Sequence, residues 1–314
     1  MNDAPHIPVM LSEVLEVMAL KDGGVYVDGT LGAGGYTRAM LDAVDCRVIA
    51  IDRDETAIQA AQSWSKEYGD RLTLVHGAFG DVSQHLKSAG INKIDGIVVD
   101  IGVSSMQIDQ ADRGFSFRFD GPLDMRMDTS QGETAAEIIN SRKEENIANL
   151  IYKYGEERLS RRIAKAIINN RPFETTAELA GVVRSVVPRS KKDGIDPATR
   201  TFQALRIAVN DELGELERLL ESSPDVLAQN GRLVVVAFHS LEDKIVKSFM
   251  RGQKNSTSRH EPVLCHNEGS DNAPPLSMLS KKAILPTDTE KKINPRSRSA
   301  RLRVAENLAV EGNV

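Results

Sequence analysis

The sequence lacks the features that mark secreted and membrane proteins. Its 314 residues include only two cysteines, Cys46 and Cys265, and no CxxC pair, so neither a disulfide framework nor a four-cysteine zinc site is encoded. No apolar run approaches the roughly 20 residues of a transmembrane helix. The N-terminus, MNDAPHIPVM, has no basic segment followed by an apolar one, as a signal peptide would. We therefore expect a cytoplasmic protein with no membrane partner.

The chain is slightly acidic overall, with 40 Lys and Arg against 45 Asp and Glu, but its positive charge is concentrated in two segments. The formal net charge of −5 argues, by itself, against a nucleic-acid partner. The segment from Arg142 to Arg206 nevertheless holds 14 Lys and Arg against 8 Asp and Glu, and that from Lys281 to Arg303 holds 8 against 2. Each carries +6, which leaves −17 for the rest of the chain. Such segments are either ordinary solvated faces or local phosphate-binding surfaces, and the arginine-rich second segment favours phosphate contact.

Apolar runs in the first hundred residues alternate with helical patterns. Four strands are predicted at Val25–Val27, Arg47–Ile51, Leu72–Val75 and Ile94–Ile101, and a strong fifth at Arg232–Phe238. Nearly continuous apolar strands separated by helices indicate a mostly parallel sheet covered on both faces. The fold class is therefore predicted to be α/β and doubly wound.

A long helical stretch interrupts this α/β pattern. Helices are predicted at Asn140–Tyr154, Glu156–Asn170, Thr176–Val187 and Pro197–Leu220. We therefore expect one discontinuous domain, residues 1–105 and 217–314, with an all-helical domain, expected to recognise the substrate, inserted at 106–216. The segments 252–272 and 294–299 are predicted to be irregular.

A glycine-rich turn, DGTLGAGGYT, follows the first predicted strand and precedes a helix. Glycines there let a ligand approach the main-chain N–H groups at a helix N-terminus. The nicotinamide fingerprint GxGxxG is not met, because Thr37 occupies the place of its third glycine. The pattern D-x-T-x-G-x-G-G, which begins at Asp28, resembles instead the first motif of class I (Rossmann-like) S-adenosylmethionine-dependent methyltransferases.

Each of the next three strands also ends in a candidate ligand-binding residue. Asp52 could accept both hydroxyls of a ribose, or could cap the following helix. Phe79 could lie on an adenine face or belong to the core. Asp100 closes the fourth strand, at the sheet edge where ligands bind in open α/β folds.

Longer motifs make the resemblance more specific. The runs DIGVSSMQ, RGFSF, DGPLDMRMD, FHSLED and NPRSRSARLR, in this order, resemble the RsmH (MraW) family of bacterial methyltransferases. The resemblance implies methylation of N4 of a cytidine in 16S ribosomal RNA near the decoding centre, with S-adenosylmethionine as cofactor and a homodimer as one possible assembly. The cofactor-contacting positions it implies are Gly34, Gly35, Tyr36, Asp52, Phe79, Asp100 and Gln107. Tyr36 stands where the family is expected to have histidine.

The residues around the fourth strand bear on the chemistry. Methylation of cytosine C5 needs a thiolate, and no cysteine lies near Asp100. Methylation of an amine needs in-line placement and a proton acceptor, which Asp100, Ser104 or Ser105 could supply. The D/N-P-P-Y motif of many amino-methyltransferases is absent.

The RNA contacts are expected from His239 and from three arginines of the tail, Arg296, Arg298 and Arg301. His239 could equally have a structural role, and a hydrolase triad with Ser240 is disfavoured because no G-x-S-x-G elbow exists. No metal site is expected, because His260, Cys265 and His266 lack a fourth ligand at a suitable spacing.

Two other functions remain open at this point. A nicotinamide-dependent oxidoreductase would share the sheet, and the missing third glycine counts against it. A non-catalytic RNA-binding ribosome-assembly factor would share the basic segments. The presence of Asp28, Gly34, Asp52 and Asp100 disfavours this second alternative, and a methyl-transfer assay would distinguish it from a methyltransferase.

Overall fold

The computed structural model describes residues 7–188, 194–253 and 276–308. The chain forms two compact units, one of Met1–Gly102 with Gly214–Val314 and the other of Val103–Leu213. Both boundaries lie three residues before the predicted ones. Each unit is described by itself below.

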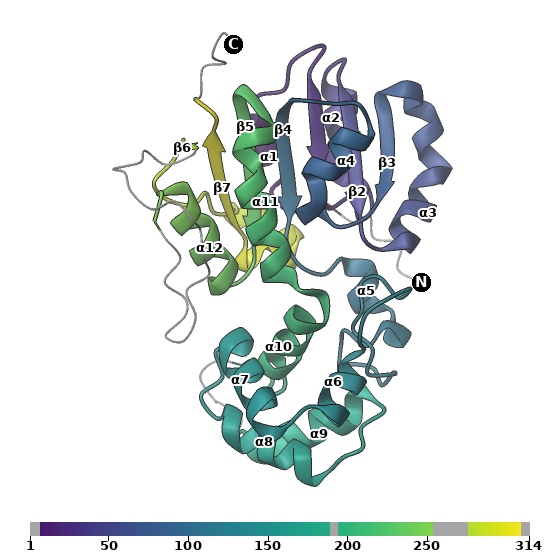
Figure 1. The fold of residues 1–314 in the computed structure, drawn as a ribbon, viewed down its shortest axis with the longest axis vertical. Coiled ribbons are helices and arrows are strands. Elements are labelled where there is room, and N and C mark those ends of the chain that lie inside the picture. The colour runs from purple at the N-terminus through teal and green to yellow at the C-terminus, as the bar shows by residue number, and fades with distance from the viewer. Residues whose placement is uncertain (1–6, 189–193, 254–275, 309–314) are drawn as a thin grey trace. The chain divides into compact units, whose positions relative to one another are not determined.

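The first unit is built on a seven-stranded sheet of order β3-β2-β1-β4-β5-β7-β6 (Figure 1). Strands β1 to β5 are parallel, and β7 runs antiparallel to β5 and β6. This order confirms the predicted doubly wound, mostly parallel sheet. The strands are β1 Val25–Asp28, β2 Arg47–Asp52, β3 Leu72–His76, β4 Ile94–Asp100, β5 Leu227–Ala237, β6 Ser277–Met278 and β7 Arg301–Glu306.

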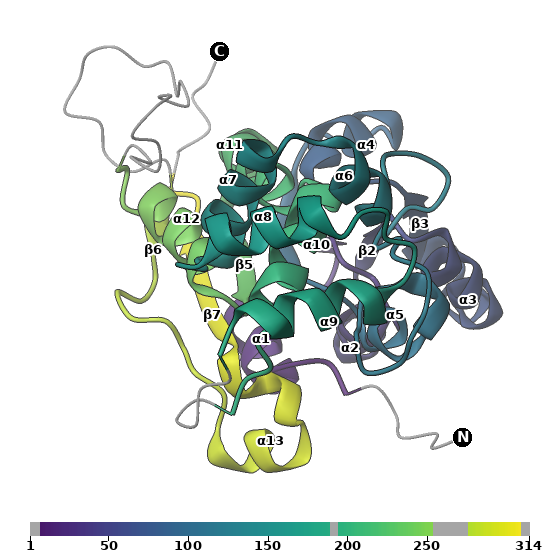
Figure 2. The same cartoon turned by 90° about the horizontal axis from the view of Figure 1, so that it is seen from below.

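Helices cover both faces of this sheet because its central strands are apolar on both sides. Val48 to Ile51 of β2 are all buried, for example. Figures 1 and 2 show α1, α2 and α3 on one face and α4, α11 and α12 on the other. The helices of this unit are α1 Leu11–Met18, α2 Gly35–Ala43, α3 Glu55–Ser65, α4 Val82–Ser88, α11 Glu212–Val226, α12 Ser240–Met250 and α13 Asp288–Ile293, with 3-10 helices η1 Lys66–Arg71, η2 Phe79–Asp81 and η4 Pro295–Ser299.

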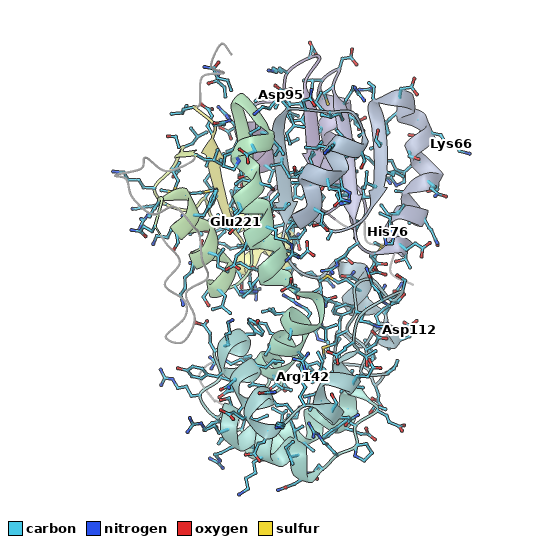
Figure 3. The ribbon with its side chains drawn as sticks, in the orientation of Figure 1. Lys66, His76, Asp95, Asp112, Arg142 and Glu221 are labelled. Carbon is cyan, nitrogen blue, oxygen red and sulfur yellow. The ribbon has the colours of Figure 1, made fainter. Side chains whose placement is uncertain are left out.

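The strand register brings the carboxyl ends of the strands to one edge. Asp52 pairs with His76 across β2 and β3, and Asp100 pairs with Val236 across β4 and β5. Figure 3 shows His76 at this edge and Asp95, near the start of β4, at the opposite one. The strand order reverses between β1 and β4, and in such sheets this switch point is where ligands bind.

The second unit is helical and has its own core, which includes Ile138, Ile151, Ile163, Leu179 and Leu205. Its helices are α5 Ser105–Asp109, α6 Ala135–Ser141, α7 Glu144–Gly155, α8 Ser160–Asn169, α9 Thr176–Val186 and α10 Thr199–Asn210, with the 3-10 helix η3 Ala111–Arg113.

Several predictions of local structure are wrong. Strand β5 begins at Leu227, five residues before the predicted Arg232, and the helix expected at Glu156–Asn170 begins only at Ser160. The single helix expected at Pro197–Leu220 is two helices, α10 and α11, because Asp211 has the left-handed conformation, with φ of 48°. The segment 294–299, expected to be irregular, contains η4, which begins with Pro295 at its first position. No helix in the described ranges is long and apolar enough to span a bilayer.

Candidate active site

Asp28, at the end of β1, fixes the glycine-rich loop from both sides. This carboxylate is fully buried, and it accepts hydrogen bonds from the Thr30 N–H (3.1 Å) and the Thr37 hydroxyl (2.7 Å). Thr37 stands where a nicotinamide-binding loop would have its third glycine. Here its hydroxyl ties the first turn of α2 to β1, so the departure from GxGxxG has a structural reason.

Gly34 has a conformation and surroundings that exclude a side chain. Its φ is +80°, which favours glycine, and a Cβ built on it would lie 2.3 Å from Cζ2 of Trp64. The indole of Trp64, from α3, therefore lies directly against this turn. The Gly34 N–H donates to the Leu31 carbonyl (2.7 Å), which closes the turn.

Asp52 is held by the backbone at the end of β2. One of its oxygens accepts the Gly32 N–H (2.7 Å) and the other the Asp54 N–H (2.8 Å). The helix cap is Asp54, whose side chain accepts the Thr56 N–H, so the capping alternative for Asp52 is wrong. An ionised carboxylate can accept about four hydrogen bonds, and Asp52 therefore fits two ribose hydroxyls. Burial raises its pKa to about 6.

Phe79 lies beside the start of the same loop. It is the first residue of η2, after β3, and it is half-buried. A Cβ built on Gly29 would lie 3.1 Å from the Phe79 Cβ. Among the described residues Phe79 is not part of the fully buried core, so its ring remains suited to stack on an adenine.

Asp100, at the end of β4, has a buried oxygen with no partner. Its N–H donates to the Thr30 hydroxyl (2.7 Å), which joins β4 to the glycine-rich loop. Its Oδ1 is buried and accepts no hydrogen bond from the described residues. Burial, with the nearby carboxylates of Asp28, Glu242 and Glu290, raises its pKa well above the usual value. An unpaired acid beside a glycine cradle fits S-adenosylmethionine, which carries an ammonium and a sulfonium charge.

Gly35 and Tyr36 are covered by the N-terminal segment. A Cβ on Gly35 would lie 2.7 Å from Cγ of Pro8, and the buried Tyr36 hydroxyl donates to the Val9 carbonyl. The Tyr36 side chain is therefore packed inside the protein. At this position a ligand can contact the backbone of the first turn of α2. Sequence reasoning missed this cover, since no local pattern links residues 7–10 to the loop.

His239 forms the N-cap of α12, and both of its ring nitrogens face Glu242. Nδ1 accepts the Glu242 N–H (3.4 Å), and Nε2 lies 2.7 Å from Oε1 of the buried Glu242 carboxylate. The other oxygen of that carboxylate accepts the Phe238 N–H (2.8 Å). The H-x-x-E spacing of a capping box could have signalled this arrangement. An RNA contact of His239 stays a prediction.

Ser104, Ser105 and Gln107 belong to the other unit. Ser104 and Gln107 form the capping box of α5: the Ser104 hydroxyl accepts the Gln107 N–H (3.2 Å), and the Gln107 amide oxygen accepts the Ser104 N–H (3.0 Å). The side chain of Ser105 lies outside the part of the chain that the structure describes. Their predicted roles at the cofactor and in catalysis therefore stay predictions.

The three predicted arginines of the tail differ in their surroundings. Arg296 and Arg298 are exposed on η4. Arg301 lies on β7, and its guanidinium donates to Asp243 (2.9 Å), which also accepts from the buried Arg303 (2.7 Å). Arg301 therefore has a role within the fold that competes with an RNA contact.

Metal binding finds no support in the described ranges. No group of three His, Cys, Asp or Glu side chains within them could hold an ion. The residues considered from the sequence, His260, Cys265 and His266, lie outside those ranges.

Comparisons with known proteins agree with this site. The model of the MraW methylase family matches residues 3–308. "Ribosomal RNA small subunit methyltransferase H" of Paramagnetospirillum magneticum is 55% identical over 98% of both chains, and that of Rhodospirillum rubrum is 56% identical over 96% of this chain and 94% of its own. A solved rRNA methylase from Streptococcus thermophilus matches with a TM-score of 0.42 and 12% identity over 95% of this chain and 94% of that chain, a likeness too distant to bear on function.

The family match confirms the predicted resemblance, enzyme class and cofactor, and it excludes the oxidoreductase alternative. A methylase with Asp52, Asp100 and an intact glycine-rich loop is an S-adenosylmethionine-dependent enzyme. The chain belongs to the MraW methylase family.

Proposed function

We propose that this protein transfers a methyl group from S-adenosylmethionine to the exocyclic N4 of a cytidine in 16S ribosomal RNA, near the decoding centre. The observation that carries the proposal is the similarity, over nearly the whole chain, to proteins named ribosomal RNA small subunit methyltransferase H. The geometry of the site supports two parts of this proposal, the binding of S-adenosylmethionine and the methylation of nitrogen.

The cofactor is proposed to lie along the carboxyl ends of β1, β2 and β4. Bound S-adenosylmethionine supplies an electrophilic methyl group. Asp52 accepts the ribose hydroxyls, Phe79 stacks on the adenine, and the backbone at Gly34 and Gly35 accommodates the amino-acid end. The unpaired Oδ1 of Asp100 supports a polar contact with that end or with the substrate amine.

The residues at the end of β4 support methylation of nitrogen rather than of carbon. Of the two cysteines, Cys46 is buried and precedes β2, so it cannot serve as the thiolate that C5 methylation requires. The exocyclic amine would take the methyl carbon as the bond from that carbon to the sulfonium sulfur breaks, which leaves S-adenosylhomocysteine, and the methylated nitrogen would then have to lose a proton. Asp100 is the proposed acceptor, because its buried Oδ1 has no hydrogen-bond partner among the described residues, and a raised pKa makes its ionised form a stronger base.

RNA binding is proposed to involve η4 and extrusion of the target base. A base inside a helix is out of reach of a recessed site, and enzymes acting on bases turn them out of the stack. Arg296 and Arg298 are the proposed phosphate contacts, since both are exposed on η4. The assembled small subunit as substrate, the cytoplasm as location and a homodimer stay expectations.

A labelling experiment tests the proposal. The protein is incubated with radiolabelled S-adenosylmethionine and ribosomal subunits from cells that lack this modification, beside Asp100→Asn as a matched control of similar shape. We expect label in the small-subunit RNA and none in the large-subunit RNA, with transfer by Asp100→Asn reduced at least 100-fold because a proton acceptor is lost. Absence of label from the small-subunit RNA would refute the proposal.

A further inference from the structure

The exposed face of α8 carries a cluster of cations that pair with no acidic side chain among the described residues. Ile163, Ala164 and Ile167, on the opposite face, are buried in the core of the second unit, so the helix is rigidly held. We define the α8 stripe as the exposed side chains Arg158, Arg161, Arg162 and Lys165. Arg158 lies in the turn before the helix, and the spacing of i, i+3, i+4 and i+7 places all four on one side.

The cations of the α8 stripe differ from most of the arginines around them. No ion pair or hydrogen bond joins their side chains to any described residue, whereas other arginines of the same unit pair with carboxylates. Those pairs are Arg126–Asp124 (2.8 Å), Arg142–Glu133 (2.9 Å), Arg184–Asp196 (3.0 Å) and Arg206–Glu212 (2.7 Å). These four arginines are therefore neutralised by carboxylates of the same unit, whereas the cations of the α8 stripe are not.

Acids near the stripe in sequence are engaged elsewhere. Glu157 is buried, accepts the Leu159 N–H (2.8 Å) and lies 3.8 Å from Arg200. Glu156, which precedes it, also has an interaction partner. The positive charge of the stripe is consequently not cancelled by the residues that lead into the helix.

Helix stability does not explain the arrangement. Like charges three and four residues apart on a helix repel and oppose its formation, so the stripe works against α8. A polyanion bound along this face would attract these cations and so offset their mutual repulsion. Three of the four cations are arginines, whose planar guanidinium binds phosphate through two parallel hydrogen bonds.

We propose that the α8 stripe is a docking site for the phosphate backbone of the substrate RNA. This inference rests on the proposed function, because an RNA substrate is the polyanion that such an enzyme must hold. It adds a binding surface in the helical unit to the residues proposed on η4. Contacts to phosphate position an RNA without reading its sequence.

The test compares two double variants that remove the same charge from the same unit. Arg161→Gln with Arg162→Gln removes two stripe cations, and Arg142→Gln with Arg184→Gln removes two paired ones; Figure 3 labels Arg142. The full-length proteins bind a small-subunit rRNA transcript over a range of about 50 to 200 mM KCl. The slope of log affinity against log salt is measured, with S-adenosylmethionine affinity and thermal stability as checks on the fold.

We expect the stripe variant to lower the magnitude of the salt slope by about 1.4 to 1.8, since each lost phosphate contact removes about 0.7 to 0.9. The control variant should leave the slope nearly unchanged, because its arginines are already paired. An equal effect of both variants, or none from the stripe variant, overturns the inference. The inference is also overturned if the stripe variant binds phosphatidylglycerol vesicles more weakly than the wild type but shows the same salt slope for RNA. Wild-type protein that methylates neither the transcript nor small ribosomal subunits overturns the proposed function itself.

Discussion

Two buried carboxylates set the properties of the cofactor site at the scale of single residues. Burial raises the pKa of both Asp28 and Asp52 to about 6. Asp28 uses its hydrogen bonds inside the protein, whereas Asp52 keeps acceptor capacity for a ligand. The first residue therefore shapes the loop, and the second is available to bind the ribose.

Replacing Asp52 with alanine should weaken S-adenosylmethionine binding by about 100-fold or more. The reason is the loss of two hydrogen bonds to a charged acceptor, each worth about 1.5 to 3 kcal/mol. Isothermal titration calorimetry measures the change, and Asp52→Asn, which keeps the shape and one acceptor, should lose less. An alanine variant that folds and binds normally would remove Asp52 from the site.

Cofactor binding should also weaken in acid. A protonated carboxyl presents an O–H donor in place of an acceptor, so Asp52 binds ribose only when ionised. Since its pKa in the folded protein is about 6, we expect constant affinity above about pH 7 and a fall approaching tenfold per pH unit below about pH 6. Asp28 and Asp100 are present in both the wild-type protein and Asp52→Asn. The difference between the pH profiles of their cofactor affinities therefore comes from Asp52. Identical pH profiles would contradict this assignment.

Gly34 gives a steric prediction with a close control. Alanine at Gly34 would be strained at φ of +80° and would overlap Trp64, whereas Gly23, with φ of +72°, has nothing within 4 Å of a built Cβ. Gly34→Ala should lose about 1 to 3 kcal/mol of stability and most of its cofactor affinity. Gly23→Ala should lose about 1 kcal/mol and keep its affinity. Thermal melts measure the stability of both variants, and calorimetry measures their cofactor affinity. Equal losses of stability and affinity in the two variants would count against the contact with Trp64.

At the scale of elements, the two ends of the chain meet at the cofactor loop. Glu290, on α13, accepts the Met10 N–H (2.6 Å), and Asn294 donates to the Ile7 carbonyl (3.2 Å). The segment 7–10 held in this way is the one that covers Gly35 and Tyr36. The element that carries the exposed arginines, η4, begins directly after Asn294.

Loosening this connection should therefore affect the cofactor site from a distance. We expect Glu290→Gln to weaken S-adenosylmethionine binding about 3- to 10-fold, because a charge-assisted hydrogen bond is replaced by a neutral one. Asp288→Asn, on the same helix, breaks only an exposed pair with Lys291 (3.1 Å) and should change little. Calorimetry on both variants tests this, and a Glu290→Gln affinity equal to that of Asp288→Asn would exclude the connection.

The elements also show what the sequence could predict. Strands β1 to β4 were predictable to within one or two residues because each is a continuous apolar run between helical patterns. Asp52 and Asp100 followed, since both end such strands. The break at Asp211 depends on one left-handed residue, and the segment over Gly35 depends on contacts hundreds of residues apart. The hydrophobic periodicity of the sequence carries no sign of either feature, so it could not predict them.

At the scale of the whole molecule, the acidic total charge conceals separate basic surfaces. The first basic segment includes arginines of two kinds, those paired with carboxylates and those of the α8 stripe. In the second segment, Arg301 and Arg303 bind Asp243, and Arg296 and Arg298 are exposed on η4. The sequence locates the charge, and only side-chain partners distinguish a phosphate-binding surface from an internal ion pair.

The account rests on one claim about the product, which is methylation of N4 of a cytidine in small-subunit RNA. The most direct measurement digests small-subunit RNA, modified by the protein with labelled S-adenosylmethionine, to nucleosides and identifies the labelled one by chromatography and mass spectrometry. The account predicts a single labelled species, N4-methylcytidine, from one site in the RNA. Label in 5-methylcytidine, or in a nucleoside other than cytidine, would contradict it.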